Sequence, residues 1–318
     1  MKSIIFIKFL FLLVLALSFC NAKSISNYIN DLKERKRDIE FYLKVTDIER
    51  DITFNDKKRT LDVYYKKEEE IEELKPVVIF IYGGTWHEGD KVKFTKVGSL
   101  LKDNDYISVI PNYILFPIGG FEDMVNDIYT SIQWTYENIE KYGGDPKRIT
   151  IVGHSAGAHL VALTLFKSYN SMKNLRKELE PLPELEKVIL LSGPYDFDDY
   201  SKLKNYLGKD IENSLLEQFV KVLFRTKDVS PYDIVKAMGD NSVDDGFNVK
   251  KFILYYTSKD DKIPEISVHK LMNQMKRVSE NVNIEYIYRE GFTHDAITSG
   301  MRNDKQEQID YFLYLLEL

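Results

Sequence analysis

The chain has 318 residues, of which 44% are hydrophobic and 30% are charged, with 16 glycines and 9 prolines. This composition excludes a collagen-like, low-complexity or disordered protein and predicts a globular fold with a sizeable core. The 44 basic and 50 acidic residues are interspersed and give a net charge of −6. This charge argues against a nucleic-acid partner, because nucleic-acid binding needs a basic surface.

The first 22 residues are typical of a secretory signal peptide. An apolar run over Phe9–Leu17 follows two lysines, and Cys20-Asn21-Ala22 offers small residues for a cleavage site. Lys8 leaves about 11 apolar residues, whereas a membrane helix needs roughly 20. We therefore expect residues 1–22 to be removed, which leaves no stable membrane span and directs the protein to the secretory-pathway lumen or the exterior. The alternative is an uncleaved leader that tethers the protein to a membrane.

The mature chain, residues 23–318, is expected to lack disulfides and cysteine-bound metal, because Cys20 is the only cysteine. It begins with a charged segment, Lys23–Thr46, that is compatible with a solvated helix. Asp47–Phe54 and Thr60–Tyr65 then alternate roughly between apolar and polar residues, which predicts a β-hairpin.

Six short apolar runs follow, and helical patterns separate several of them. Runs that are apolar on both faces suit parallel strands covered by helices, so the alternation predicts a doubly wound α/β fold. The predicted strands are Pro76–Tyr82, Ile107–Ile110, Ile149–Val152, Val188–Leu191, Phe252–Tyr256 and Ile284–Tyr288, and the predicted helices are Phe121–Thr135, Ile266–Val278 and Asp304–Leu316.

The stretch between the predicted strands Val188–Leu191 and Phe252–Tyr256 is long for a single crossover. Residues 193–247 are therefore expected to form a small cap insertion, with a helix-like piece over Ile211–Phe224. No linker divides the mature chain, so we expect one domain over residues 23–318.

The motif that carries chemistry is Gly153-His154-Ser155-Ala156-Gly157, which follows the strand Ile149–Val152 and precedes a helical segment. G-x-S-x-G in this context predicts a sharp turn that exposes a nucleophilic serine, and the glycines make room for that turn. Because a serine hydroxyl is a weak nucleophile near neutral pH, Ser155 needs a general base.

In folds with this motif, the acid and then the histidine follow the serine along the chain. His294 comes just after the last predicted strand, in a glycine-containing loop, whereas His269 lies inside a predicted helix, so His294 is favoured as the base. Asp260 and Asp261 both follow the strand Phe252–Tyr256. Asp260, four residues before a proline, is the favoured partner of the imidazole, and Asp261 is expected to be solvated or capping.

The turn Tyr82-Gly83-Gly84-Thr85-Trp86 follows another strand at the same predicted edge. The N–H groups of Gly84 and Thr85, together with that of Ala156, are expected to bind a developing oxyanion, and Gly83 and Trp86 are expected to contact substrate. An ordinary tight turn is the alternative. Several aromatic residues are equally compatible with a substrate pocket and with core packing: Trp86, Phe116, Tyr195, Phe197 and Tyr200.

These motifs, taken with Pro111-Asn112-Tyr113, Asp123-Met124-Val125-Asn126-Asp127 and Tyr142-Gly143-Gly144-Asp145-Pro146, occur in the order of a known family. They resemble the carboxylesterase branch of the α/β-hydrolases, which includes isoprenylcysteine methylesterases, kynurenine formamidases and hormone-sensitive-lipase-like esterases. The resemblance is to the isoprenylcysteine methylesterase-like group in particular, and it covers most of Lys75–Leu318. It implies an eight-stranded, mostly parallel sheet and a Ser155–Asp260–His294 triad that uses no cofactor or metal.

The sequence departs from that pattern at two positions. Tyr82 stands where the family's H-G-G-x-W motif begins with histidine, and Ile114 replaces an arginine that usually follows the Asn-Tyr pair. The second change predicts that a buried ion pair is missing.

These observations predict a serine carboxylesterase that acts on a small-molecule ester through an acyl-enzyme. The alternatives are cleavage of an aryl formamide and hydrolysis of a prenylcysteine methyl ester. A non-catalytic binding protein of the same fold is a further alternative, which the presence of all three triad residue types in order disfavours.

Overall fold

The computed structural model describes residues 22–197 and 228–318, so the predicted leader lies almost wholly outside the described residues. The chain divides into two units, residues 1–44 and 45–318. In the first unit, helix α2 (Ala22–Lys44) confirms the predicted helix over Lys23–Thr46. Across the described residues, we find no helix with the length and apolar character needed to cross a membrane.

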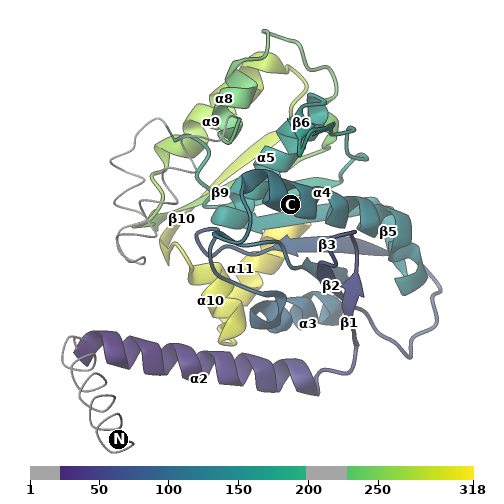
Figure 1. The fold of residues 1–318 in the computed structure, drawn as a ribbon, viewed down its shortest axis with the longest axis vertical. Helices are drawn as coiled ribbons and strands as arrows, with labels where there is room; N and C mark the ends of the chain where they lie inside the picture. The colour runs from purple at the N-terminus through teal and green to yellow at the C-terminus, as the bar shows by residue number, and fades with distance from the viewer. Residues whose placement is uncertain (1–21, 198–227) are drawn as a thin grey trace, which may run out of the picture. The chain divides into compact units, whose positions relative to one another are not determined.

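The second unit is built on an eight-stranded sheet with the order β1-β2-β4-β3-β5-β8-β9-β10 (Figure 1). The two-stranded hairpin is confirmed: β1 and β2 are antiparallel, β2 is also antiparallel to β4, and all other neighbours are parallel. The strands are β1 (Ile48–Thr53), β2 (Thr60–Tyr64), β3 (Lys75–Ile81), β4 (Ile107–Pro111), β5 (Gly144–His154), β8 (Lys187–Leu191), β9 (Phe252–Lys259) and β10 (Ile284–Thr293).

Helices cover both faces of the sheet, as the apolar strands require. Figure 1 shows α3, α10 and α11 on one face, and α4, α5, α8 and α9 on the other. The α-helices are α3 (Thr95–Asp103), α4 (Phe121–Asn138), α5 (Ala156–Tyr169), α8 (Pro231–Lys236), α9 (Ile266–Val278), α10 (Ala296–Arg302) and α11 (Gln306–Glu317). The 3₁₀ turns are η1 (Lys91–Phe94), η2 (Ile139–Tyr142) and η3 (Gly246–Asn248), and a small hairpin joins β6 (Lys173–Asn174) to β7 (Lys177–Glu178).

Helix α5 lies at the centre of the core. All of its residues from Ala156 to Ser168 are buried, so the helix is enclosed around its whole circumference and carries no exposed stripe. Strands β3, β4 and β8 are likewise buried over most of their length. Since α5 begins directly after Ser155, the best-packed part of the molecule positions the predicted nucleophile.

Asp127 on α4 forms a buried ion pair close to Ile114. Asp127 is 1% exposed, and its Oδ2 lies 3.2 Å from Nε of Arg59, which belongs to the β1–β2 hairpin. Asp127 also accepts hydrogen bonds from Ile114 N at 2.9 Å and from Asn55 Nδ2 at 2.8 Å. The side chain of Ile114 supplies no cation here, and the charge that faces Asp127 comes from the hairpin.

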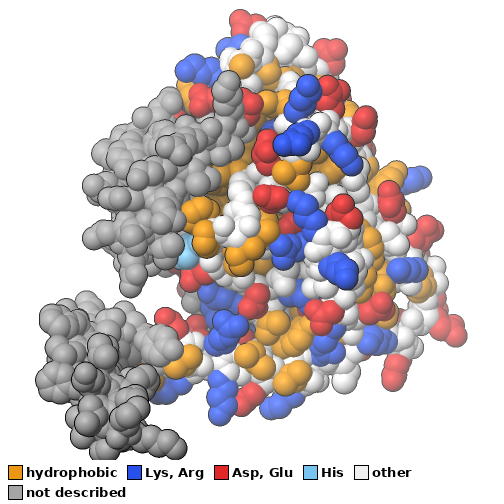
Figure 2. All heavy atoms as spheres, viewed as in Figure 1, with side chains coloured by type: hydrophobic (Ala, Val, Ile, Leu, Met, Phe, Trp, Pro, Cys, Tyr) orange, Lys and Arg blue, Asp and Glu red, His pale blue; other side chains and the backbone are white. Residues whose placement is uncertain are grey.

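Part of the predicted cap insertion can be described. Residues 193–197 and 228–247 contain α8. Ser230 caps the start of this helix, because its hydroxyl accepts a hydrogen bond from Asp233 N at 3.1 Å. The remaining part of the expected cap, including Ile211–Phe224, lies outside the described residues. On the face of the molecule in Figure 2, basic and acidic side chains are interspersed, as the sequence indicated.

Candidate active site

Ser155 occupies a sharp turn between β5 and α5. Its backbone has φ 54° and ψ −120°, a conformation that costs energy for a residue with a side chain and persists only where the surroundings enforce it. The enforcing contacts are close: a Cβ on Gly153 would lie 2.7 Å from Cα of Ala158, and a Cβ on Gly157 would lie 2.3 Å from the carbonyl oxygen of Ile81. Only glycine fits at either position.

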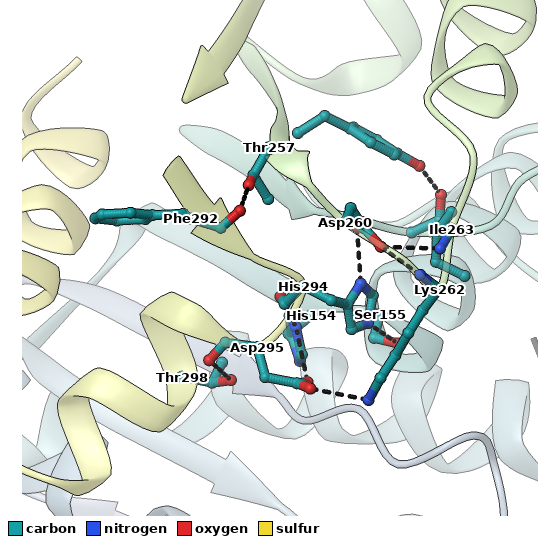
Figure 3. Close-up of polar contacts among 12 residues, drawn as sticks. His154, Ser155, Thr257, Asp260, Lys262, Ile263, Phe292, His294, Asp295 and Thr298 are labelled. Atoms are coloured by element: carbon teal, nitrogen blue, oxygen red, sulfur yellow. Dashed lines mark hydrogen bonds and ion pairs between the residues drawn. The ribbon is translucent and has the colours of Figure 1, made fainter. Parts of the chain in front are cut away.

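The structure brings the three predicted side chains together (Figure 3). His294 Nε2 lies 2.9 Å from Ser155 Oγ, and His294 Nδ1 lies 2.8 Å from Asp260 Oδ2. His294 follows directly on β10, which extends to Thr293. The first part of the loop expected over residues 290–295 is therefore an irregular end of that strand. Because a carboxylate only accepts, Nδ1 carries the hydrogen and Nε2 is free to accept the serine proton.

Asp260 is fixed by its own loop. Its Oδ1 accepts hydrogen bonds from the backbone N–H groups of Lys262 at 3.0 Å and Ile263 at 2.9 Å, which leaves Oδ2 to face the imidazole. Burial raises the pKa of Asp260, but His294 and the two N–H groups outweigh that effect and hold the pKa below its ordinary value. The group is therefore a carboxylate at neutral pH.

The turn after β3 packs against this site. Gly84 has φ 123°, and a Cβ there would lie 2.2 Å from the carbonyl oxygen of Glu88, while a Cβ on Gly83 would lie 2.8 Å from that of His154. Thr85 and Trp86 also have positive φ, at 46° and 61°. Gly83, Gly84 and Thr85 line the same cavity as Ser155, as expected for an oxyanion-binding turn.

Tyr82 anchors the start of this turn. Its hydroxyl donates to Asn112 Oδ1 at 3.0 Å, and its carbonyl accepts from the hydroxyl of Tyr113 at 3.0 Å. Its ring stacks on those of Tyr113 and Phe94, with centroids 4.8 and 5.4 Å away. A tyrosine thus ties the turn to two neighbouring segments at the position where the family has histidine.

Trp86, expected to contact substrate, is fully buried in the core. Its indole Nε1 donates to Nδ1 of His159 at 3.0 Å, and Nε2 of His159 in turn donates to the carbonyl of Val229 at 2.7 Å. The indole ring also packs edge-on against Phe121 and Phe197. Trp86 therefore supports the turn from behind and is not a lining residue of the cavity.

A cavity of about 250 Å³ opens beside Ser155, and its lining is mainly polar. Of the aromatic residues weighed for a pocket, Tyr195 and Phe197 are buried, Phe116 does not line this cavity, and Tyr200 lies outside the described residues. The cavity is also lined by five charged residues that no sequence motif indicated: Glu88, Lys93, Lys262, Asp295 and Arg302. Lys262 is two residues after the predicted acid and Asp295 directly follows the predicted base, and that proximity was the available signal.

His154, His294 and Asp295 have potential metal-ligating atoms within 4.8 Å of one another, and they form the one such group among the described residues. Both nitrogens of His294 already face Ser155 and Asp260, and Nε2 of His154 lies 3.1 Å from the carbonyl oxygen of His294. Hydrogen bonds therefore account for these donor atoms.

Comparison with known proteins identifies the family to which this fold and site belong. The BD-FAE family model matches residues 61–250, more than half of the chain. The chain belongs to the BD-FAE family. This finding confirms the expected place among the α/β-hydrolases.

Curated relatives agree with that placement. A probable isoprenylcysteine α-carbonyl methylesterase of Arabidopsis thaliana is 28% identical over 76% of this chain and 57% of its own length. Esterase LipC of Mycobacterium tuberculosis is 24% identical over 76% of this chain and 57% of its own length. The chain thus spans a little over half the length of these relatives.

Solved structures share the fold. Esterase B of Lactobacillus rhamnosis superposes with a TM-score of 0.68 at 18% identity, covering 93% of this chain and 94% of that one. An esterase from Thermogutta terrifontis superposes with a TM-score of 0.59 at 18% identity, covering 86% and 94%. The predicted eight-stranded, mostly parallel α/β-hydrolase fold is thereby confirmed.

Proposed function

We propose that this protein is a serine carboxylesterase with Ser155 as nucleophile, His294 as general base and Asp260 as the acid that orients the base. The observation that carries the proposal is the unbroken series of hydrogen bonds from Ser155 Oγ through the imidazole to Asp260, with distances of 2.9 and 2.8 Å. Both distances are within the range needed for proton transfer and for orientation of the base.

In the proposed acylation step, His294 Nε2 takes the proton of Ser155 as Oγ attacks the ester carbonyl. Negative charge then develops on the carbonyl oxygen, and the N–H groups of Gly84, Thr85 and Ala156 stabilise it. Asp260 stabilises the imidazolium and keeps its ring oriented. The imidazolium next protonates the departing alcohol, and Ser155 is left acylated.

In deacylation, a water molecule takes the place of the departed alcohol, and His294 again acts first as a base and then as an acid. His294 removes a proton from a water molecule, the resulting hydroxide attacks the acyl carbonyl, and the imidazolium returns the proton to Ser155 as the carboxylic acid leaves. The two half-reactions consume one water per ester and need no other reactant.

The cavity supports a substrate with a short or polar acyl group. Its lining is mainly polar, and the aromatic side chains that would have formed an apolar pocket, such as Trp86 and Tyr195, are buried elsewhere. Structures of the Thermogutta terrifontis esterase that shares this fold contain propionate and butyrate. A long prenyl chain would lose its apolar contacts against this lining.

A labelling experiment tests the proposal directly. The full chain is treated with a fluorophosphonate, digested and mapped, and label is expected on Ser155. Ser155→Ala should lose label and reduce kcat by about a million-fold, whereas Ser242→Ala, an exposed serine, should retain both. Label on another residue, or equal turnover by Ser155→Ala, would refute the assignment.

A substrate series then separates the alternatives. p-Nitrophenyl esters from acetate to dodecanoate are compared with N-formylkynurenine and a prenylcysteine methyl ester. The highest kcat/KM is expected for the shortest esters. Faster cleavage of the formamide or of the prenylcysteine ester would replace the proposed substrate class, and failure to cleave any of them would favour a binding protein.

A further inference from the structure

The segments that carry the acid and the base are exposed around their functional side chains. Lys259 and Asp261 on either side of Asp260 are exposed, as are Glu290 and Thr293 before His294. The pairing of β10 with β9 is also irregular between Arg289 and Thr293. The strands alone therefore leave the orientation of the imidazole incompletely specified.

Lys262 links the two segments at this point. Its Nζ lies 2.9 Å from Oδ2 of Asp295, the residue after His294, while its backbone N–H donates to Asp260. Figure 3 shows this ion pair beside the series of contacts from Asp260 to Ser155. One residue thus touches the proposed acid and the neighbour of the proposed base.

Asp295 has the position of a helix cap but does not act as one. It is the N-cap residue of α10, where an aspartate side chain ordinarily accepts a backbone N–H, yet its side chain makes no such bond. Its backbone oxygen receives Ser299 N at 2.8 Å and Thr298 Oγ1 at 3.2 Å. The carboxylate is instead directed at Lys262 and His154, with Oδ1 3.8 Å from His154 Nε2.

His154 contacts the base from the other side. Burial lowers the pKa of His154 to about 4, so its ring is neutral near pH 7. Its Nε2 lies 3.1 Å from the carbonyl oxygen of His294, and because a carbonyl only accepts, Nε2 carries the hydrogen and donates it. The backbone of His294 is thereby held by a side chain from the nucleophile turn.

We propose that Lys262, Asp295 and His154 are positioning residues that hold the His294 imidazole for proton transfer, with the Lys262–Asp295 ion pair clasping the acid segment to the base segment. This inference rests on the proposed esterase function. It assigns no contact with substrate to the three residues, since they act through His294.

The two charges of the Lys262–Asp295 ion pair also act on the imidazole of His294. The charged and titratable groups near the imidazole are Asp260, Asp295, Lys262 and His154, and the same cavity is lined by Glu88, Lys93 and Arg302. The carboxylate of Asp295 favours the imidazolium and the ammonium of Lys262 opposes it. Removing one or the other should therefore move the acid limb of the kcat/KM profile in opposite directions.

The test measures kcat, KM and the pH profile of the full chain with p-nitrophenyl butyrate. Asp295→Asn should lower kcat about tenfold with KM changed less than about twofold, and should move the acid limb to lower pH by about half a unit. Lys262→Met should lower kcat similarly and move the limb to higher pH, while Lys262→Arg should retain most of the activity. The double variant should be no slower than the slower single variant, because the two residues form one unit.

Matched controls separate positioning from general loss of charge or stability. Lys259→Met removes an exposed charge from β9, and Glu290→Gln removes one from β10. Ser258→Ala removes a different link between β9 and β10, a hydrogen bond of 2.9 Å that the serine hydroxyl accepts from Gly291 N. All three should leave kcat and the acid limb unchanged. Circular dichroism confirms that each variant is folded.

Two results would overturn the inference. One is a wild-type kcat in Asp295→Asn and Lys262→Met, and the other is a shift of the acid limb equal to that of the charge controls. Failure of the function itself would look different, because the wild type would then hydrolyse no ester faster than Ser155→Ala.

Discussion

Ser155 and His294 lie 2.9 Å apart, yet the chain holds the two residues in different ways. Ser155 is enclosed by a buried strand and a fully buried helix, and backbone contacts leave only glycine at positions 153 and 157. His294 follows a strand end with exposed residues and is held by hydrogen bonds and an ion pair. Close packing therefore fixes Ser155, the proposed nucleophile, whereas directional polar contacts fix His294, the proposed base.

Substitutions in the two regions should therefore have different effects on stability and activity. A change near Ser155 that adds volume must displace backbone, so it should affect folding and activity together. A change near His294 can remove a polar contact while the core stays intact, so it should affect turnover and its pH dependence with a smaller effect on stability.

The largest effect on the polar side is expected for Asp260→Asn. An amide can donate to Nδ1, which favours the wrong tautomer of His294 and leaves the imidazolium without its counter-charge, so kcat should fall about ten-thousand-fold. The measurement is kcat on p-nitrophenyl butyrate, with Asp56→Asn, an exposed aspartate of the β1–β2 hairpin, as control. A loss of less than tenfold would mean that Asp260 does not orient the base.

A smaller loss of kcat is expected for Gly84→Ala, a change in the closely packed region. A Cβ there would lie 2.2 Å from the carbonyl oxygen of Glu88, so Gly84→Ala must move the turn that carries two oxyanion donors. We expect kcat to fall about a hundred- to a thousand-fold, together with a lower unfolding temperature. Gly120→Ala is the matched control, because a Cβ at that glycine meets no atom within 4 Å. Equal kcat in the two variants would contradict the assignment of the turn.

The smallest expected effect is on the pH dependence of the unfolding free energy, and it involves His159. Burial lowers the pKa of His159 to about 4, below its ordinary value of 6.5, so the unfolded chain binds a proton more readily than the folded one. This contribution to stability is complete above pH 6.5 and is lost as the pH falls towards 4. His154, which has a similar pKa, should contribute in the same direction.

Urea titrations between pH 7 and pH 5 check this expectation. His159→Gln should lose about half as much unfolding free energy over that interval as the wild type, because one of the two imidazoles whose pKa burial lowers is gone. An identical slope in His159→Gln would show that His159 is not held neutral in the fold.

Most of the closely packed region around Ser155 could be predicted from the sequence. Apolar periodicity predicted the central strands and helix Ile266–Val278 with its observed bounds, because burial on one or both faces leaves a repeating pattern. The G-x-S-x-G motif predicted the turn at Ser155, because close backbone contacts demand glycine at fixed spacing. The choice of Asp260 and His294 followed from where strands end.

The polar contacts, including those around His294, were harder to predict from the sequence. Lys262 and Asp295 lie in the segments that follow β9 and β10, and their pairing leaves no periodic signal. Arg59 pairs with Asp127, from which it is 127 − 59 = 68 residues distant along the chain. The short helix α10 and helix α3 were not predicted, and aromatic content alone did not reveal that Trp86 belongs to the core. Such features depend on which surfaces meet after folding.

Tyr82 has a consequence for how the site responds to acidity. A histidine at this buried position would gain a proton only in acid, as burial lowers the pKa of His154 and His159 to about 4, but it would still be titratable close to the proposed oxyanion donors. Burial raises the pKa of the Tyr82 phenol far above its ordinary value, so the ring stays electrically silent while its hydroxyl keeps Asn112 in place. Acidification of the medium therefore brings no change of charge at residue 82, beside the proposed oxyanion donors.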